Sequence, residues 1–138
     1  MNFQEEIRKI NRKIERLDRC KANCGDVNSY KVYTALLNQS GTDAPIATVL
    51  QNTLNVNVEY IYNDVGDYIA VFDKPLFNSP NEYVLITGNS LDTVIEAFTV
   101  FYDALQIHSY DGGALTDNVI GNLFAPRNPC ILEIRQYI

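Results

Sequence analysis

The sequence is 138 residues long, with a mass of 15.6 kDa, 46% hydrophobic positions and 20% charged positions. This size suits one compact domain and excludes a large multidomain enzyme. The net charge of −6 argues against a protein whose whole surface is drawn to nucleic acid, so we expect no nucleic-acid partner.

Export and membrane insertion are also not expected. No run approaches the roughly 18 uninterrupted apolar residues that a membrane span needs, and the N-terminus is charged where a signal peptide would place its apolar segment. The three cysteines are too few and too oddly numbered for a disulfide framework, which fits folding in a reducing cytosol. We therefore expect a soluble, unexported product.

Residues 1–25 have the pattern of a helix with a narrow apolar stripe. They hold seven basic and four acidic residues, a charge of +3, while the remainder of the chain carries −9. Apolar residues recur at alternating spacings of four and three, which keeps them on one side of a helix and defines a heptad seam. Lys13 and Asp18 occupy position g and the following e, where a parallel neighbour could pair them. The predicted oligomer interface consists of Phe3, Ile7, Ile10, Ile14, Leu17 and Cys24.

This stripe needs a cover, because a helix so polar on most of its circumference is barely stable alone at this length. Sister copies of the chain and the downstream domain are the two candidates. Isoleucine at both a and d tends to favour three or more strands, so we favour a homotrimeric coiled-coil stalk. Lys21 falls at the next a position and Gly25 fits a C-terminal cap, which predicts that the seam ends near residues 20–24.

Two of the cysteines, Cys20 and Cys24, lie four residues apart on the predicted helix. Three copies of Cys24 would lie close to a trimer axis, where thiols could bind a soft metal or cross-link. Two cysteines without histidines are a weak metal signature, so we interpret them as unmodified thiols and expect no metal. Cys130, between Pro129 and Ile131, has the setting of an ordinary strand-entry residue.

From residue 29 onward the pattern changes to short β-rich runs separated by turn residues at intervals of about ten. This spacing predicts a mainly β chain, with an antiparallel β-sandwich or barrel head over residues 29–138. The clearest alternation of apolar and polar residues precedes a predicted hairpin loop at 63–67. The predicted strands cover residues 30–37, 56–62, 68–73, 82–87, 93–101, 105–110 and 131–138.

Three of these strands carry more specific expectations. The nearly continuous apolar run at 82–87 favours a central strand covered on both faces. Residues 93–101 would also satisfy a helical stripe, but β-branched and aromatic residues dominate and favour a strand. In the last strand the inward side chains are predicted to be Leu132, Ile134 and Ile138, and the outward ones Glu133, Arg135 and Tyr137.

Two stretches of the β domain resemble a known family. Residues 30–54 read YKVYTALLNQSGTDAPIATVLQNTL, and near the other end Asp111-Gly112, Pro129 and the run LEIRQY at 132–137 follow one another. The sequence of these stretches resembles that of a domain that recurs in virion proteins of phages infecting Bacteroidetes, including crAss-like phages. That domain tends to close with an Asp-Gly turn, a Pro and a final Ile-Glu-Ile-Arg-x-Tyr strand.

The resemblance spans residues 30–138 and leaves the N-terminal helix outside it. This chain departs from the family by extra residues at 113–124, which lengthen the final loop. What the resemblance implies is a structural protein of a bacteriophage virion, assembled in the host cytoplasm. Its role would be that of a subunit of a head fibre or capsid decoration, with other virion proteins as partners. The family is defined by its sequence pattern and not by catalytic residues, so no site residue is carried over.

No motif announces a reaction, and we expect no enzyme, no catalytic residue and no cofactor. His108 is the only histidine, which excludes a His-based metal triad, and on a strand a half-buried histidine is the ordinary interpretation. Gly112-Gly113 is followed by Ala-Leu-Thr without a Lys, so a β-turn explains this pair better than a phosphate loop.

The alternative function is a tail-fibre or fibre-tip adhesin that binds a host surface glycan. Loops 63–67 or 111–129 would make the contacts, since aromatic faces stack on sugars. Core or intersubunit packing is the more ordinary role for the aromatic residues, and the absence of Trp weakens the case. The tyrosines that could line such a surface are Tyr33, Tyr60, Tyr62 and Tyr137.

Overall fold

In the computed structural model the chain divides into two compact units, Met1–Tyr30 and Lys31–Ile138. The first holds one helix and the second is built from antiparallel strands, which confirms a mainly β chain with an N-terminal helix. The structure describes residues 2–24, 29–88, 92–121 and 130–138, with only the backbone described for residues 16–24.

Helix α1 covers Phe3–Cys24, where the heptad pattern predicts a helix. Asn2 caps its start, because the Asn2 Oδ1 accepts a hydrogen bond from the Gln4 amide at 3.1 Å. Glu5 and Glu6 lie in the first turn, where negative charge is stabilised by the positive end of the helix dipole. The local sequence is therefore enough to define where this helix begins.

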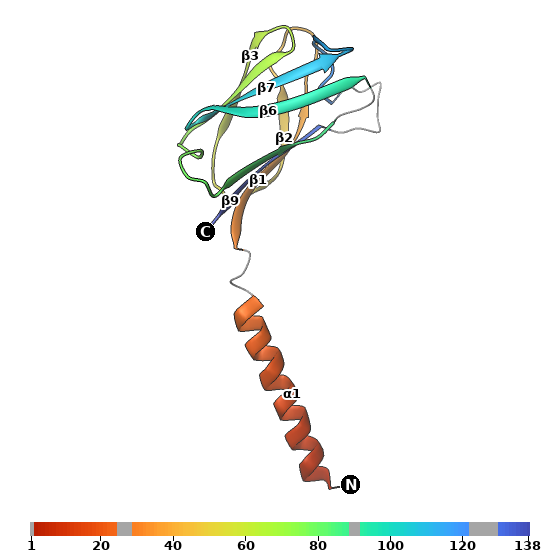
Figure 1. Ribbon diagram of the computed structural model, residues 1–138, viewed down its shortest axis with the longest axis vertical. Helices are drawn as coiled ribbons and strands as arrows, with labels where there is room; N and C mark the ends of the chain where they lie inside the picture. The colour runs from red at the N-terminus through yellow and green to blue at the C-terminus, as the bar shows by residue number, and fades with distance from the viewer. Residues whose placement is uncertain (1, 25–28, 89–91, 122–129) are drawn as a thin grey trace. The chain divides into compact units, whose positions relative to one another are not determined.

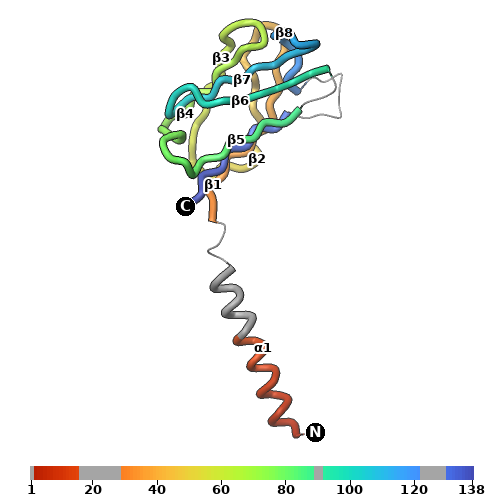
Figure 2. Tube along the Cα trace, in the orientation of Figure 1, coloured from red at the N-terminus to blue at the C-terminus, as the bar shows by residue number. Residues whose placement is uncertain are grey.

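The second unit consists of two antiparallel sheets (Figures 1 and 2). The strands of the first, in spatial order, are β2 (Ile46–Asn52), β1 (Tyr30–Asn38), β9 (Cys130–Tyr137) and β5 (Glu82–Ile86). Those of the second are β3 (Val58–Asp64), β4 (Asp67–Phe72), β7 (Ala104–Asp111) and β6 (Thr93–Phe101), and the short β8 (Ala114–Leu115) pairs with β7. The described strands form two separate sheets with free edges, so the head is a sandwich and not a closed barrel.

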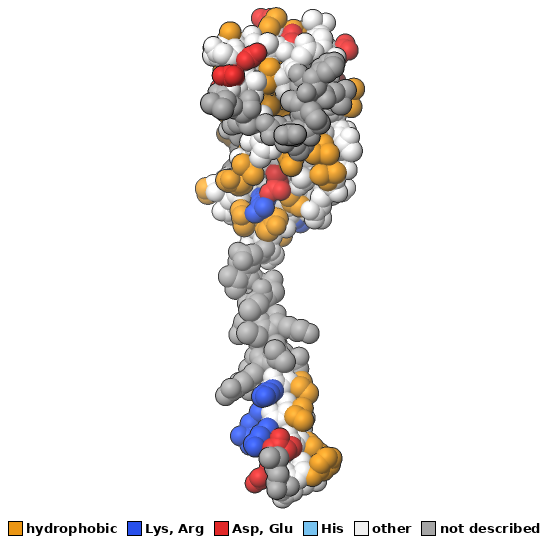
Figure 3. Space-filling model, turned by 90° about the vertical axis from the view of Figure 1, so that its right-hand side faces the viewer, with side chains coloured by type: hydrophobic (Ala, Val, Ile, Leu, Met, Phe, Trp, Pro, Cys, Tyr) orange, Lys and Arg blue, Asp and Glu red, His pale blue; other side chains and the backbone are white. Residues whose placement is uncertain are grey.

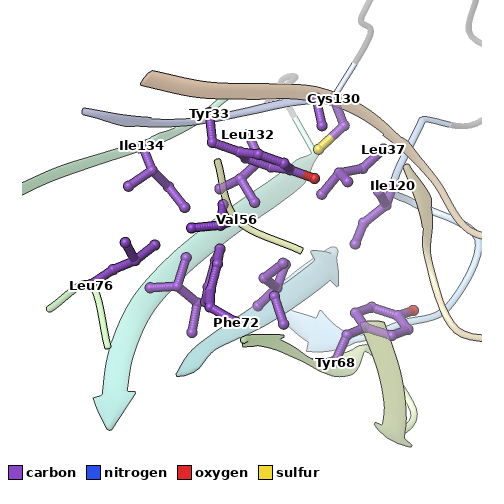
Figure 4. Packing of buried hydrophobic residues seen from close by; sticks show 14 of the residues in the cluster. Tyr33, Leu37, Val56, Tyr68, Phe72, Leu76, Ile120, Cys130, Leu132 and Ile134 are labelled. Atoms are coloured by element: carbon purple, nitrogen blue, oxygen red, sulfur yellow. The ribbon is translucent and has the colours of Figure 1, made fainter. Parts of the chain in front are cut away.

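The core lies between the inward faces of the two sheets (Figure 4). In β1, β4, β7 and β9 alternate residues point inward over most of the strand, as the two-residue period of a strand requires. Leu132 and Ile134 contribute from β9, and Tyr68 contributes from β4; all three are buried. The Tyr33 and Phe72 rings meet edge to face across the interior, with centroids 6.5 Å apart. Each fully buried apolar side chain of this kind contributes about 1.5–3 kcal/mol to folding.

Two local predictions for this unit are confirmed. The segment that also fitted a helix, 93–101, forms strand β6 with those bounds. Loop 63–67 is the tight turn between β3 and β4, and Gly66 has a φ of +66°. A Cβ atom there would lie 2.5 Å from the Thr116 amide nitrogen, so only glycine fits this turn.

Other predictions for the β domain are wrong. β5 is an edge strand and not a central one, because its side chains alternate and Tyr83 and Leu85 are 49% and 40% exposed. Ile138 does not face inward; it lies beyond the end of β9 and is 82% exposed. Strand β2 was not predicted at all. Its side chains are nearly all exposed, so no apolar alternation marks it in the sequence.

Candidate functional site

The helix carries the first candidate site, a stripe of apolar side chains. Phe3, Ile7, Ile10 and Ile14 are exposed by 77%, 37%, 54% and 50%. In Figure 3 the hydrophobic side chains lie along one side of the described part of the helix, and Lys and Arg side chains gather on the other. The side chains of Leu17 and Cys24, the other two predicted interface residues, lie outside the described part, as does that of Cys20.

Covering these exposed side chains would contribute a large favourable free energy to association. Covering a single Ile side chain is worth about 1.5–3 kcal/mol, and the four described residues would act together. The polar side of the helix adds little stability to a helix on its own, because its Lys9–Glu6 ion pair, at 3.0 Å, is exposed to solvent. The helix is therefore suited to association through its stripe.

The four tyrosines predicted to line a glycan surface do not form one. Tyr33 is buried, and its hydroxyl lies 3.2 Å from that of Tyr60, which packs against the core. Burial raises the pKa of Tyr33 and, more strongly, that of Tyr60. Tyr62 also packs against the core, and only Tyr137 is exposed. These tyrosines mainly hold the sandwich together.

Asp117 ties the β3–β4 turn to the rest of the domain. Its carboxylate accepts hydrogen bonds from the Gly66 amide at 2.8 Å and from the hydroxyls of Tyr68 at 2.7 Å and Tyr62 at 2.9 Å. Burial opposes the charge, but these donors outweigh it and hold the pKa of Asp117 below its ordinary value of 3.8. Loop 63–67, one of the two predicted glycan-contact loops, is thus fixed by internal hydrogen bonds.

Replacing Asp117 by Ala is expected to destabilise the β domain by about 1–3 kcal/mol, because the hydroxyl of the buried Tyr68 loses this acceptor. The carboxylate stabilises the native domain above about pH 4, and this contribution is lost as the pH falls through its lowered pKa. Urea unfolding at several pH values should show that the free energy of unfolding falls more steeply with decreasing pH in the native protein than in the variant. Asp73, whose pKa is lowered by Asn57, is present in both and cancels in the comparison. Parallel curves would contradict the role of Asp117.

His108 belongs to a network of polar and aromatic side chains on the β domain. Its Nε2 lies 3.4 Å from the Asp67 Oδ1, and its Nδ1 lies 3.1 Å from the Tyr110 hydroxyl. The Phe98 ring contacts the imidazole edge to face, with centroids 5.0 Å apart. The Tyr110 hydroxyl in turn donates a hydrogen bond to Glu96 at 3.0 Å. Both ring nitrogens are therefore already engaged by neighbouring side chains.

No group of three or more His, Cys, Asp or Glu side chains in the described part of the chain is arranged to hold a metal ion. Helix α1, the helix found there, lacks the combination of length and apolar composition needed to cross a membrane.

Cys130 is a buried thiol at the start of β9, as expected for a strand-entry residue. Burial raises the pKa of the Cys130 thiol to about 12, so at neutral pH it is protonated and shielded. We expect Cys130 to resist a thiol reagent such as dithionitrobenzoate in the native protein and to react once the protein is unfolded in urea. Peptide mapping by mass spectrometry identifies the labelled cysteine. Rapid labelling of Cys130 without denaturant would contradict its placement in the core.

The β domain also carries a hollow that the sequence analysis missed. Its volume is about 750 Å³, within the range of small-molecule sites. Of the described aromatic residues in this unit, Phe101 and Tyr102 are the most exposed, at 72% and 70%. The sequence does contain a signal for this hollow: Phe101 and Tyr102 stand at the end of a strand and in the turn after it, where polar residues are usual. The chief lining residues are Pro75, Phe77, Val100, Phe101, Tyr102 and Asp103.

Comparison with known proteins adds no relative: no family model, no curated protein and no solved structure matches this chain. The geometry of the described residues thus gives two candidate sites, the apolar stripe of α1 and the aromatic hollow beside the β6–β7 turn.

Proposed function

We propose that this protein is a structural subunit of a phage virion, a homotrimeric head fibre or capsid decoration held together by helix α1. The observation that carries the proposal is the exposed apolar stripe at heptad spacing, Phe3, Ile7, Ile10 and Ile14. A stripe of this kind is costly to leave in water, and knobs-into-holes packing against copies of itself covers it.

The spacing favours sister helices as the cover. Alternation of three and four residues is the period at which a seam keeps facing a parallel partner helix. With isoleucine at a and d, three strands pack better than two. The charge pattern agrees, because Lys13 at g would lie near Asp18 at the following e of a neighbouring copy.

The virion assignment rests on the β domain. The sequence of residues 30–54 and 132–137 resembles that of phage virion domains, and a β-sandwich that follows an oligomerising helix along the chain is a unit that a fibre or decoration can repeat. In this proposal the partners are two further copies of the chain and other virion proteins, the place of assembly is the host cytoplasm, and no chemistry is performed.

The mass of the full chain in solution tests the oligomer. Sedimentation equilibrium at micromolar concentration should give three times the chain mass of 15.6 kDa. A clean monomer at that concentration would contradict the proposal. Antibody labelling of phage particles, viewed by electron microscopy, tests the location: label on the capsid supports a head fibre or decoration, and label on the tail supports a tail fibre.

A tail-fibre or fibre-tip adhesin is the second candidate function. The observation that favours it is the hollow at Phe101 and Tyr102, which offers exposed aromatic faces on a rigid domain. The two functions are compatible in one protein, since a trimeric fibre presents three such hollows. A glycan-binding measurement distinguishes a purely structural subunit from one that also attaches to a surface.

A further inference from the structure

The walls of the aromatic hollow are held in place before any ligand arrives. The Tyr102 carbonyl oxygen accepts hydrogen bonds from the amides of Leu76 at 2.7 Å and Phe77 at 2.9 Å. The Phe77 ring packs edge to face on Phe72, with centroids 5.6 Å apart, and Phe72 is itself part of the core. The backbone at Tyr102 and the Phe77 ring are therefore already ordered, so a ligand would lose little affinity to ordering of these parts of the hollow.

A β-bulge aims the aromatic residues outward. Ile95 and Ala97 of β6 face the core, and strict alternation would place Phe101 on the same face. The pairing of β6 with β7 shifts between Thr99 and Phe101, so Val100 is an extra residue in the strand. Bulges of this kind re-aim side chains and are common beside binding sites. Here the shift leaves Phe101 72% exposed and not buried.

The chemistry of the walls selects the class of ligand. Phe101, Tyr102 and Phe77 offer apolar ring faces, and among the described lining residues Asp103 alone carries a charge. In the described residues no side-chain hydrogen bond or ion pair of Asp103 is found, so its carboxylate is available to accept hydrogen bonds from hydroxyl groups. An acidic group in an acidic protein disfavours anionic ligands.

We propose that this hollow binds a neutral oligosaccharide of hexopyranose or pentopyranose units linked β-1,4. The glucose and xylose members of this class carry only equatorial hydroxyls and the mannose member carries one axial hydroxyl, so each has a ring face of axial C–H groups that can stack on Phe101 and Tyr102. Their hydroxyls donate hydrogen bonds to Asp103. The proposal deepens the adhesin function by naming its site and ligand class, and it does not depend on the trimer.

Titration of the protein with cellohexaose, xylohexaose and β-1,4-linked mannohexaose tests the site, with β-1,4-linked hexamannuronate as the anionic counterpart of mannohexaose. Because the chain has no tryptophan, tyrosine fluorescence is observed without a tryptophan background, and its change on titration reports binding. Chemical shifts of the amides at 99–103 locate it. We expect at least one neutral probe to bind and the β-1,4-linked hexamannuronate to bind at least tenfold more weakly than that probe.

Variants of the hollow define the contribution of each wall. Tyr102→Ala and Phe101→Ala should each weaken binding on the order of tenfold, and the double variant should abolish it. Asp103→Asn should weaken it on the order of threefold, since a neutral amide is a poorer acceptor than a carboxylate. Tyr83→Ala, at a 49% exposed tyrosine of β5, is the matched control and should bind within twofold of the native protein.

Two outcomes would overturn the site: no binding of any neutral probe, or equal binding by the double variant with native-like circular dichroism. Light scattering on the same samples separates the two proposals. A trimer that binds no sugar would contradict the proposed sugar site but not the trimer. A monomer that binds sugar would contradict the trimer but not the site.

Discussion

The double substitution of Ile10 and Ile14 by Asp is expected to convert the proposed trimer into a monomer. Each trimer would then hold six carboxylates in its seam, and an uncompensated buried charge costs about 3–5 kcal/mol. This cost corresponds to a loss of association by several orders of magnitude. Light scattering should therefore show a threefold fall in mass, and the far-ultraviolet signal of the helix should weaken, because an isolated helix of this length is barely stable.

The matched control for this variant is Arg12→Asp. It changes the net charge by the same two units but lies at heptad position f, away from the stripe, and its side chain is exposed. The control should keep the native mass and helix signal. An unchanged mass in the double-Asp variant, with the control also unchanged, would show that the stripe does not hold copies together.

Replacing Leu132 by Ala is expected to destabilise the β domain by about 2–5 kcal/mol. Leu132 is fully buried on β9, a central strand of the first sheet, and the substitution leaves a cavity that rigid neighbours fill poorly. For a domain of this size the midpoint of thermal unfolding should fall on the order of 10 °C or more. Differential scanning calorimetry measures the shift.

The control here is Leu85→Ala on β5, where the side chain is 40% exposed on the outward face. That substitution should change stability by less than about 0.5 kcal/mol. The mass of the Leu132 variant should remain that of the native oligomer below its unfolding midpoint, since the association is proposed to reside in α1. A monomeric Leu132 variant that is still folded would instead place part of the interface on the sandwich.

The elements with strong local patterns were the ones that sequence analysis predicted well. The heptad spacing of residues 3–24 is a signal contained within one helix, and α1 covers that range. The β-branched and aromatic composition of 93–101 was enough to choose a strand over a helix. The hairpin at 63–67 also follows from local chemistry, because Gly66 supplies the positive φ of its turn.

Features that depend on neighbours in space could not be predicted in the same way. A continuous apolar run such as 82–87 does not specify how many strands flank it, and β5 lies at an edge. The hollow at Phe101 depends on a register shift between β6 and β7, which arises only when the two strands pair. The hydrogen bonds of Asp117 to Gly66 and Tyr68 join residues about fifty positions apart, which no local pattern encodes.

The place of β9 between β1 and β5 determines when the first sheet can be completed during folding. Every other strand of the sandwich precedes β9 along the chain, yet β9 joins the two halves of its sheet. The first sheet therefore cannot be completed until β9 has been synthesised, and long-range pairing of this type is slow. Helix α1 precedes every described strand along the chain, so in the proposed trimer copies of the chain can associate through it before any sandwich has closed.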